Sequence, residues 1–223
     1  ARCTGVADVI ATVDFARTNN LLVSVRGGGH SVAGNAVSDG GLMIDLSCMK
    51  GIRVDPVHHS VRAEGGVTWG ELDRETQAFG LATTGGIYSG TGIAGLTLGG
   101  GIGYLNRKYG LACDNLLSAD VVTADDRFLT ASATENDDLF WALRGGGGNF
   151  GVVTSLEYRI HPVGPVLGGM IVYPLDQAKE VLRFYREFSL TAQDEARIDV
   201  VVGALPPGPG LAIIICYCGP MEE

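Results

Sequence analysis

The chain has 223 residues, 46% of them hydrophobic, and a formal net charge of −9. This charge argues against nucleic acid and anionic membranes as partners, because their phosphates would be repelled. The five cysteines contain no metal-binding C-x-x-C pair, and no segment resembles a signal peptide or a membrane-spanning helix. A reducing, cytoplasmic environment is therefore expected.

The first half of the chain is expected to form a helix, four short strands and a second helix. Thr4 is expected to cap the first helix, and Thr68 with Glu71 forms a capping box for the second. The predicted ranges are 4–18 for the first helix, 21–25, 41–46, 51–55 and 60–64 for the strands, and 68–80 for the second helix. The glycine-rich stretch 85–103 follows neither period and is expected to be irregular.

The second half is expected to continue with a hairpin, a short helix and a strand, and then to change in character. The predicted ranges are 119–132 with a turn at 124–126, 135–144, and 152–160. A domain boundary is expected near 163–165, followed by a strand at 169–173, a helix at 175–190 and two strands around a turn at 205–210. This last part is typical of a domain that the chain begins without finishing, and we expect the protein to extend beyond both ends.

Glycine supplies 34 residues, about twice its ordinary share, and these residues are clustered. The first cluster, 26–31, follows a predicted strand. Its three glycines let backbone N–H groups converge on an anion, and Arg26 adds a charge that can pair with a phosphate. His30 supplies a nucleophile. The alternative interpretation is a tight turn that carries a surface histidine.

Two runs, 90–95 and 146–151, match the G-x-G-x-x-G pattern of Rossmann dinucleotide sites. Neither is expected to follow a strand and open a helix, as that fold requires. The chain also lacks a P-loop, a G-x-S-x-G turn and residues at zinc-ligand spacing. A nicotinamide-binding Rossmann fold, nucleotide hydrolysis, and zinc or serine chemistry are therefore disfavoured.

Three separate glycine-rich loops remain, at 26–34, 85–103 and 145–151. A ligand that touches all three must be long. An extended dinucleotide satisfies this requirement, with its pyrophosphate at the first two loops and its ring system near His30 and 148–151.

Four motifs, at 26–31, 95–103, 110–115 and 139–153, occur in the order in which a known family carries them. On these residues the chain resembles the FAD-binding domain (PCMH-type) of the vanillyl-alcohol-oxidase superfamily. Within its berberine-bridge-enzyme-like branch, the chain is similar to the 6-hydroxynicotine-oxidase-like members. The resemblance implies an α+β fold: a PCMH-type FAD-binding domain of two α+β subdomains at 1–163, its N-terminal part missing. The beginning of an α+β substrate-binding domain, an antiparallel sheet with helices, follows at 164–223.

The resemblance also implies FAD as the cofactor, bonded covalently to His30 through the flavin 8α-methyl carbon. Doubly linked members carry a cysteine where this chain has Tyr88, and commonly a histidine where it has Leu96, so a single bond is expected. The implied cofactor-binding residues are Arg26, Gly27, Gly28, Gly29, His30, Ser31, Gly34, Thr91, Gly92, Gly95, Leu98, Gly99, Gly100, Gly103, Asn149, Gly151 and Val153.

The implied activity is that of an FAD-dependent oxidase. Hydride would pass from a small alcohol, sugar or amine to the flavin, and the electrons would then pass to O2. The catalytic base is expected in the C-terminal region of the family's proteins, beyond the residues of this chain. Tyr104 is the one candidate here for a polar group facing the ring, although packing is its more ordinary role. The alternatives are a flavin dehydrogenase with another acceptor and a non-catalytic flavin-binding remnant.

Overall fold

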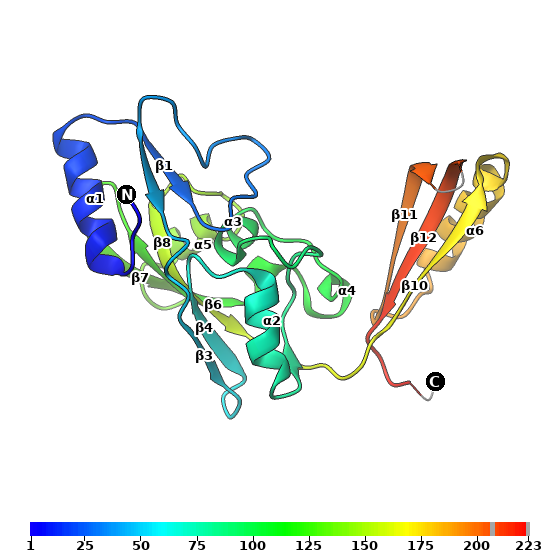
Figure 1. Cartoon of the computed structure of the whole chain (residues 1–223). Coiled ribbons are helices and arrows are strands. Elements are labelled where there is room, and N and C mark those ends of the chain that lie inside the picture. Colours follow the sequence, from blue (N-terminus) through cyan, green and yellow to red (C-terminus); the bar gives the residue numbers. More distant parts are fainter. Residues whose placement is uncertain (206–207, 222–223) are drawn as a thin grey trace. The chain divides into compact units, whose positions relative to one another are not determined.

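The computed structural model describes residues 1–205 and 208–221 (Figure 1). The chain forms two compact units. The first comprises Ala1–Gly103 and Tyr109–Pro162, and the second comprises Tyr104–Lys108 and Val163–Glu223. The chain therefore contributes Tyr104–Lys108 to the second unit, returns to the first unit at Tyr109, and leaves the first unit again after Pro162.

A five-stranded antiparallel sheet forms the centre of the first unit. Its strand order is β3-β4-β8-β6-β7 (Figure 1). The strands are β3 (Ile52–Asp55), β4 (Ser60–Glu64), β6 (Leu116–Val122), β7 (Phe128–Ser132) and β8 (Val152–Arg159). Each was predicted from the sequence, and the mixed α and β content confirms the predicted fold class.

Three helices cover one face of this sheet, and their buried side chains join those of the strands in a single core. The helices are α2 (Trp69–Gln77), α3 (Ile93–Leu98) and α5 (Asp137–Leu143). Trp69 and Phe140 from the helices belong to the same buried cluster as Val61, Leu156 and Tyr158 from the strands. Full burial of a large apolar side chain contributes about 1.5–3 kcal/mol. This cluster is therefore a main source of stability in the first unit.

Helix α3 corrects the expectation that 85–103 is irregular. Gly92 is its N-cap, and the helix includes Gly95. A glycine costs a helix about 1 kcal/mol relative to alanine. Here Ile93 and Leu98 are buried in the core, and that burial outweighs the cost. The run 90–95 thus opens a helix, but the antiparallel sheet still excludes a Rossmann fold.

A second buried cluster joins helix α1 (Val6–Thr18) to β2 (Leu42–Asp45) and to the ends of β6 and β8. Strand β1 (Val23–Arg26) pairs with β2 in parallel. The N-cap of α1 is Gly5 and not Thr4, as the sequence had suggested. The reason is that Thr4 donates both its backbone N–H and its hydroxyl to the Asp8 carboxylate.

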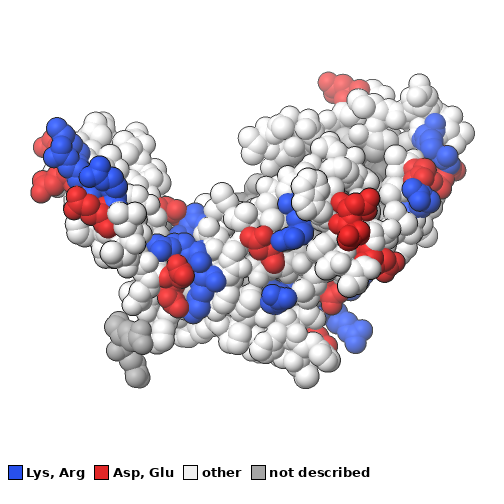
Figure 2. Space-filling model, turned by 180° about the vertical axis from the view of Figure 1, so that it is seen from behind, with Lys and Arg blue, Asp and Glu red and all other residues white. Residues whose placement is uncertain are grey.

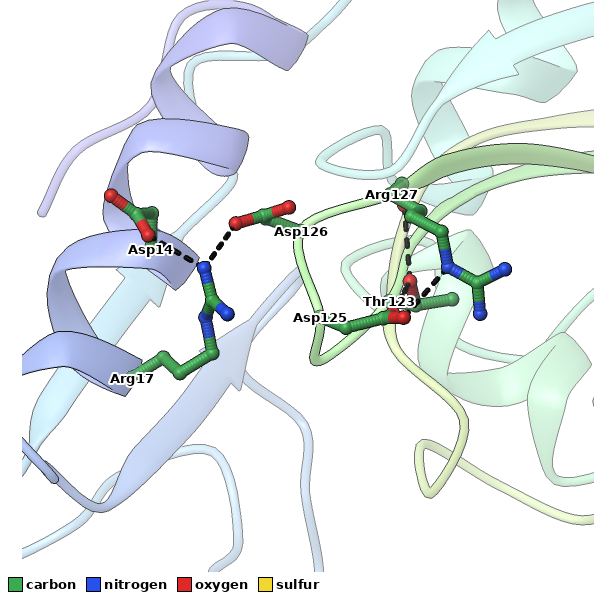
Figure 3. Close-up of polar contacts among 6 residues, drawn as sticks. All are labelled: Asp14, Arg17, Thr123, Asp125, Asp126 and Arg127. Carbon is green, nitrogen blue, oxygen red and sulfur yellow. Dashed lines mark hydrogen bonds and ion pairs between the residues drawn. The ribbon is translucent and has the colours of Figure 1, made fainter.

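Arg17 ties α1 to the turn between β6 and β7 (Figure 3). Its guanidinium lies 2.8 Å from the Asp14 carboxylate and also contacts Asp126 of the turn. Within the turn, Arg127 Nε donates to Asp125 at 2.7 Å. Asp126 has a φ of 62°, in the left-handed region. The turn predicted between these strands is therefore confirmed.

Short elements complete the first unit. The two-residue strands β5 (Leu81–Ala82) and β9 (His161–Pro162) pair antiparallel. A 3-10 turn, η1, spans Ala112–Asn115. The capping box at the start of α2 is confirmed, because the Thr68 side chain accepts the Glu71 backbone N–H while the Glu71 carboxylate accepts the Thr68 N–H at 2.8 Å. The helix ends at Gln77, earlier than predicted.

The second unit is a three-stranded antiparallel sheet with one long helix. Its strand order is β10-β12-β11. The elements are β10 (Leu167–Pro174), the 3-10 turn η2 (Leu175–Gln177), α6 (Ala178–Ser189), β11 (Ala196–Leu205) and β12 (Gly208–Tyr217). The predicted order of strand, helix, strand and strand is confirmed. The turn is narrower than 205–210, because Leu205 and Gly208 already pair; Pro206 and Pro207 lie outside the described residues.

The segment Tyr104–Lys108 and the start of helix α4 (Asn106–Tyr109) pack within the second unit. Arg197 Nη1 donates to Asn106 Oδ1 at 2.5 Å, and Arg107 donates to the Ala192 carbonyl at 2.8 Å.

Figure 2 shows basic and acidic side chains interspersed on the face it draws.

Within 1–205 and 208–221, no helix combines the length and the apolar character needed to cross a membrane. The same residues contain no group of three His, Cys, Asp or Glu side chains placed to hold a metal ion. All five cysteines are free.

Candidate cofactor site

One cavity in the first unit, with a volume of about 450 Å3, is walled by residues from all three predicted glycine loops. Strand β1, the first loop, helix α3, the third loop and strand β8 contribute to it. The lining residues are Val23, Ser24, Val25, Gly27, Ser31, Asn35, Ala36, Leu46, Ala94, Gly95, Leu98, Gly148, Asn149, Gly151 and Val153. Segments that are far apart in the sequence therefore meet at one site.

The predicted cofactor-binding residues fall into two groups. Those that line the cavity are Gly27, Ser31, Gly95, Leu98, Asn149, Gly151 and Val153. Those that do not line it are Arg26, Gly28, Gly29, His30, Gly34, Thr91, Gly92, Gly99, Gly100 and Gly103. Several members of the second group hold the loops together, as their contacts show.

Gly28 and Gly92 form a seam between the first and second loops. A Cβ added at Gly28 would lie 2.2 Å from the Gly92 backbone nitrogen, and one added at Gly92 would lie 2.4 Å from the Gly28 nitrogen. Because no side chain fits at either position, the two backbones can meet only as glycine on glycine. The seam brings the first loop against the start of α3.

The end of the second loop is fixed by backbone contacts. Gly100, with a φ of +102°, accepts a hydrogen bond from the Cys113 N–H at 2.9 Å. A Cβ added at Gly103 would lie 1.7 Å from the Gly85 carbonyl oxygen. In α3, Thr97 Oγ1 is 2.8 Å from the buried Tyr158 hydroxyl on β8. These contacts hold α3 in place as a wall of the cavity.

The third loop is connected directly to α3, because the Gly147 N–H donates to the Leu98 carbonyl at 2.8 Å. Asn149 Nδ2 donates to the Gly146 carbonyl at 2.9 Å, and Asn149 also lines the cavity. Apart from chain neighbours and the backbone of α3 itself, Cβ atoms added at Gly95 or Gly148 would meet no atom of the described residues within 4 Å. We call these two glycines the wall glycines, because they leave open space on opposite loops.

Arg26 pairs with a carboxylate of its neighbouring strand. Its guanidinium lies 3.4 Å from Asp45, the residue opposite it in the β1–β2 pair. Burial alone would raise the pKa of Asp45. The hydrogen bonds from Ser47 and the charge of Arg26 outweigh burial and hold that pKa below its usual value. Arg26 therefore supports the base of the first loop.

His30 is exposed at the tip of the first loop. Its ring lies 5.3 Å from the ring of Tyr88, centroid to centroid, at a tilt of 48°. Tyr88 stands at the position where the resemblance described above implies a cysteine in doubly linked members. The first two loops thus present an imidazole and a phenol side by side.

Seven lining residues were absent from the predicted set, whereas Gly148 was expected only as part of the loop 148–151 near the ring system. The seven are Val23, Ser24, Val25, Asn35, Ala36, Leu46 and Ala94. The apolar members of this group carry no sequence signal that separates packing from binding. Ser24, buried at 5% exposure and hydrogen-bonded to Ser38, was the one available signal, since a serine interrupts an aliphatic strand there.

The candidate Tyr104 and the motif residue Asn115 have structural partners. Tyr104 belongs to the second unit, where the Arg197 guanidinium lies 5.9 Å from the centroid of its ring. Asn115 Nδ2 donates to the Tyr109 and Leu111 carbonyls, and Asn115 Oδ1 lies 2.7 Å from His161 Nε2. Asp114 Oδ2 accepts the Leu111 N–H at 2.9 Å, so the Asp114-Asn115 pair holds a structural turn.

Comparison with known proteins agrees with this geometry. The family model described as "FAD binding domain" matches residues 1–132, which is more than half of the chain. The chain belongs to this family of FAD-binding domains. FAD is accordingly its cofactor, and the predicted membership of the vanillyl-alcohol-oxidase superfamily is confirmed.

Individual relatives place the chain in the berberine-bridge-enzyme-like branch. It is 44% identical to (R)-6-hydroxynicotine oxidase of Paenarthrobacter nicotinovorans over 174 residues, covering 78% of this chain and 38% of the relative. The structure of 6-hydroxy-D-nicotine oxidase from Arthrobacter nicotinovorans matches with a TM-score of 0.93 and 37% identity, over 100% of this chain and 50% of that one. Physcomitrella patens BBE-like 1 also matches with a TM-score of 0.93, at 28% identity, over 100% of this chain and 49% of that one. The chain spans about half the length of the relatives it matches.

The cavity has features that suit this cofactor. The wall glycines leave backbone open to the close approach that a pyrophosphate needs. Val23, Val25 and Leu46 add an apolar surface on which an aromatic ring could pack. The residues present therefore fit an extended dinucleotide.

Proposed function

We propose that the chain is the flavin-binding part of an FAD-linked oxidase that acts on a small alcohol, sugar or amine. The observation that carries the proposal is the single cavity walled by three glycine loops in a chain of the FAD-binding family. Relatives named as oxidases support it, among them a chitooligosaccharide oxidase with a TM-score of 0.88 and 30% identity, over 100% of this chain and 48% of that one.

The first loop and the wall glycines would hold the pyrophosphate through backbone N–H groups, and the apolar wall would exclude water from the cofactor. When bound, FAD supplies the acceptor for the substrate hydride. Asn149, which already fixes its own loop through Gly146, would keep the third loop closed over the site.

We propose further that His30 carries FAD through a single covalent bond to the 8α carbon. In forming it, His30 loses its N–H proton and the carbon loses one hydrogen, so that a C–N bond replaces an N–H and a C–H bond. Oxygen is the oxidant that finally takes up the two electrons and two protons, as hydrogen peroxide. The exposed position of His30 and the presence of Tyr88 in place of a cysteine support one bond.

The second unit would belong to the substrate-binding domain, because its three-stranded antiparallel sheet and helix form a compact unit of their own, with few glycines in its helix and first strands. The free cysteines support a reducing, cytoplasmic environment.

Anaerobic titration of the intact protein with alcohols, sugars and amines tests the activity. A substrate should bleach the visible flavin absorbance, and admission of oxygen should restore it with release of hydrogen peroxide. Recovery with an artificial acceptor but not with oxygen would identify the dehydrogenase instead. Flavin that dithionite bleaches and none of these substrates reduces would favour the non-catalytic remnant.

A further inference from the structure

We propose that Tyr88 is a positioning residue that orients the His30 imidazole for covalent attachment of FAD. The proposal rests on the function proposed above and assigns to Tyr88 a role in the attachment step. Tyr88 would contact the His30 ring and would not contact the atoms that form the C–N bond.

His30 needs such a partner, because little else restrains its ring. The residue is exposed and follows Gly29, whose φ is +77°. Among the described residues, the His30 ring makes no hydrogen bond or ion pair, and its ring contact is with Tyr88. An exposed imidazole on a glycine loop samples several rotamers, and most of them do not present a ring nitrogen to one fixed carbon atom.

Tyr88, in contrast, stands on a segment that is anchored to the core. The Ser89 carbonyl accepts the Gly70 N–H at 2.9 Å, and the Thr91 carbonyl accepts the N–H of the fully buried Trp69 at 2.9 Å. The Thr91 N–H in turn donates to the Tyr88 carbonyl at 3.0 Å. The backbone that carries Tyr88 is therefore held by the first turn of α2.

Gly90 provides the space that the ring of Tyr88 occupies. A Cβ added at Gly90 would lie 2.7 Å from Tyr88 Cε1, so the glycine leaves room for the phenol. The seam of Gly28 and Gly92 lies close in sequence to both residues and sets the spacing of the two loops. The contact between His30 and Tyr88 is thus a consequence of backbone packing and not of a chance surface encounter.

The expected effect follows from the strength of an aromatic pair. The interaction free energy of such a pair corresponds to a factor of about 2 to 10 in a rate constant or an equilibrium constant. Loss of the Tyr88 ring should therefore slow bond formation to His30 by this factor. The bond itself is the C–N bond described above, with oxygen as the final oxidant.

The test measures covalent attachment against time. Intact apoprotein, expressed under riboflavin limitation, is mixed with FAD in air, and samples are precipitated with acid to separate bonded from free flavin. The variants are Tyr88→Ala, Tyr88→Phe and, as a matched control, Ile87→Ala, whose side chain is the exposed neighbour at 65% against 63% for Tyr88. Reversible FAD affinity is measured for Tyr88→Ala in a His30→Ala background.

We expect Tyr88→Ala to slow attachment by about 2-fold to 10-fold, with Tyr88→Phe restoring the rate and Ile87→Ala leaving it unchanged. Reversible FAD affinity should stay at the level of His30→Ala alone. A normal rate in Tyr88→Ala, or a loss of affinity that matches the loss of rate, would overturn the positioning role. Wild-type protein that attaches no flavin would instead overturn the covalent link to His30, and the two failures are therefore distinguishable.

Discussion

The seam formed by Gly28 and Gly92 and the wall glycines Gly95 and Gly148 all lie in the three glycine-rich loops, yet their surroundings are opposite. At the seam an added Cβ would meet backbone at 2.2–2.4 Å, whereas at the wall it would meet nothing within 4 Å. The seam glycines are required by the fold, and the wall glycines leave space for a ligand. Glycine content alone therefore marks the region of the site, and the space around each glycine separates folding from binding.

The largest effect is expected at the seam. Gly28→Ala should lower the free energy of unfolding of the apoprotein by about 3 kcal/mol or more, because the new methyl group overlaps rigid backbone that has no rotamer to escape into. Urea unfolding followed by circular dichroism measures it. Gly148→Ala is the control and should unfold as the wild type does. Equal stability of the two variants would contradict the distinction between seam and wall glycines.

A smaller loss is expected where α3 is tied to the sheet. Burial raises the pKa of Tyr158, so that its hydroxyl stays protonated and hydrogen-bonded to Thr97. Tyr158→Phe should cost about 1–2 kcal/mol, since it leaves a buried hydroxyl without its partner. A double-mutant cycle with Thr97→Val isolates the pair. A coupling energy of zero would mean that the bond does not hold the wall in place.

At the wall, the sign of the effect should reverse. Gly95→Ala should raise the stability of the apoprotein by about 0.5–1 kcal/mol, because alanine is the better helix former and its methyl group meets open space. The same urea titration measures this gain. Destabilisation by Gly95→Ala would show that the wall position is closed.

The smallest effect concerns pH. Burial, followed by the nearby charges of Arg159 and His59, lowers the pKa of His161 below its ordinary 6.5. The unfolded chain therefore binds the proton more readily, so the contribution of His161 to stability is complete above pH 6.5 and declines as the pH falls below it. His161→Gln should unfold with a weaker dependence on pH in this acidic range. If the stability of His161→Gln depended on pH as that of the wild type does, a contribution from His161 with a lowered pKa would be contradicted.

Local signals in the sequence were sufficient for part of this structure. The capping box of Thr68 and Glu71 and the strands of the central sheet follow from short patterns, because hydrogen bonding and alternation act over a few residues. Helix α3 was missed, because its stability comes from burial of Ile93 and Leu98 against distant strands.

The candidate site shows the same division. Its glycine loops were recognisable, but their meeting at one cavity depends on the Gly28–Gly92 seam, which no local pattern encodes. Val23, Val25 and Leu46 were missed because an apolar residue that lines a cavity has the same chemistry as one that packs in a core.

The central claim, that the cavity between the three loops binds FAD, is tested most directly by the FAD dissociation constant of a cavity-filling variant. Gly95→Leu is compared with Gly164→Leu, whose position is equally open but lies in the second unit, both in a His30→Ala background that keeps binding reversible. We predict that Gly95→Leu weakens binding by about 10-fold or more while Gly164→Leu leaves it unchanged. Equal FAD affinity in the two variants would contradict the assignment of this cavity.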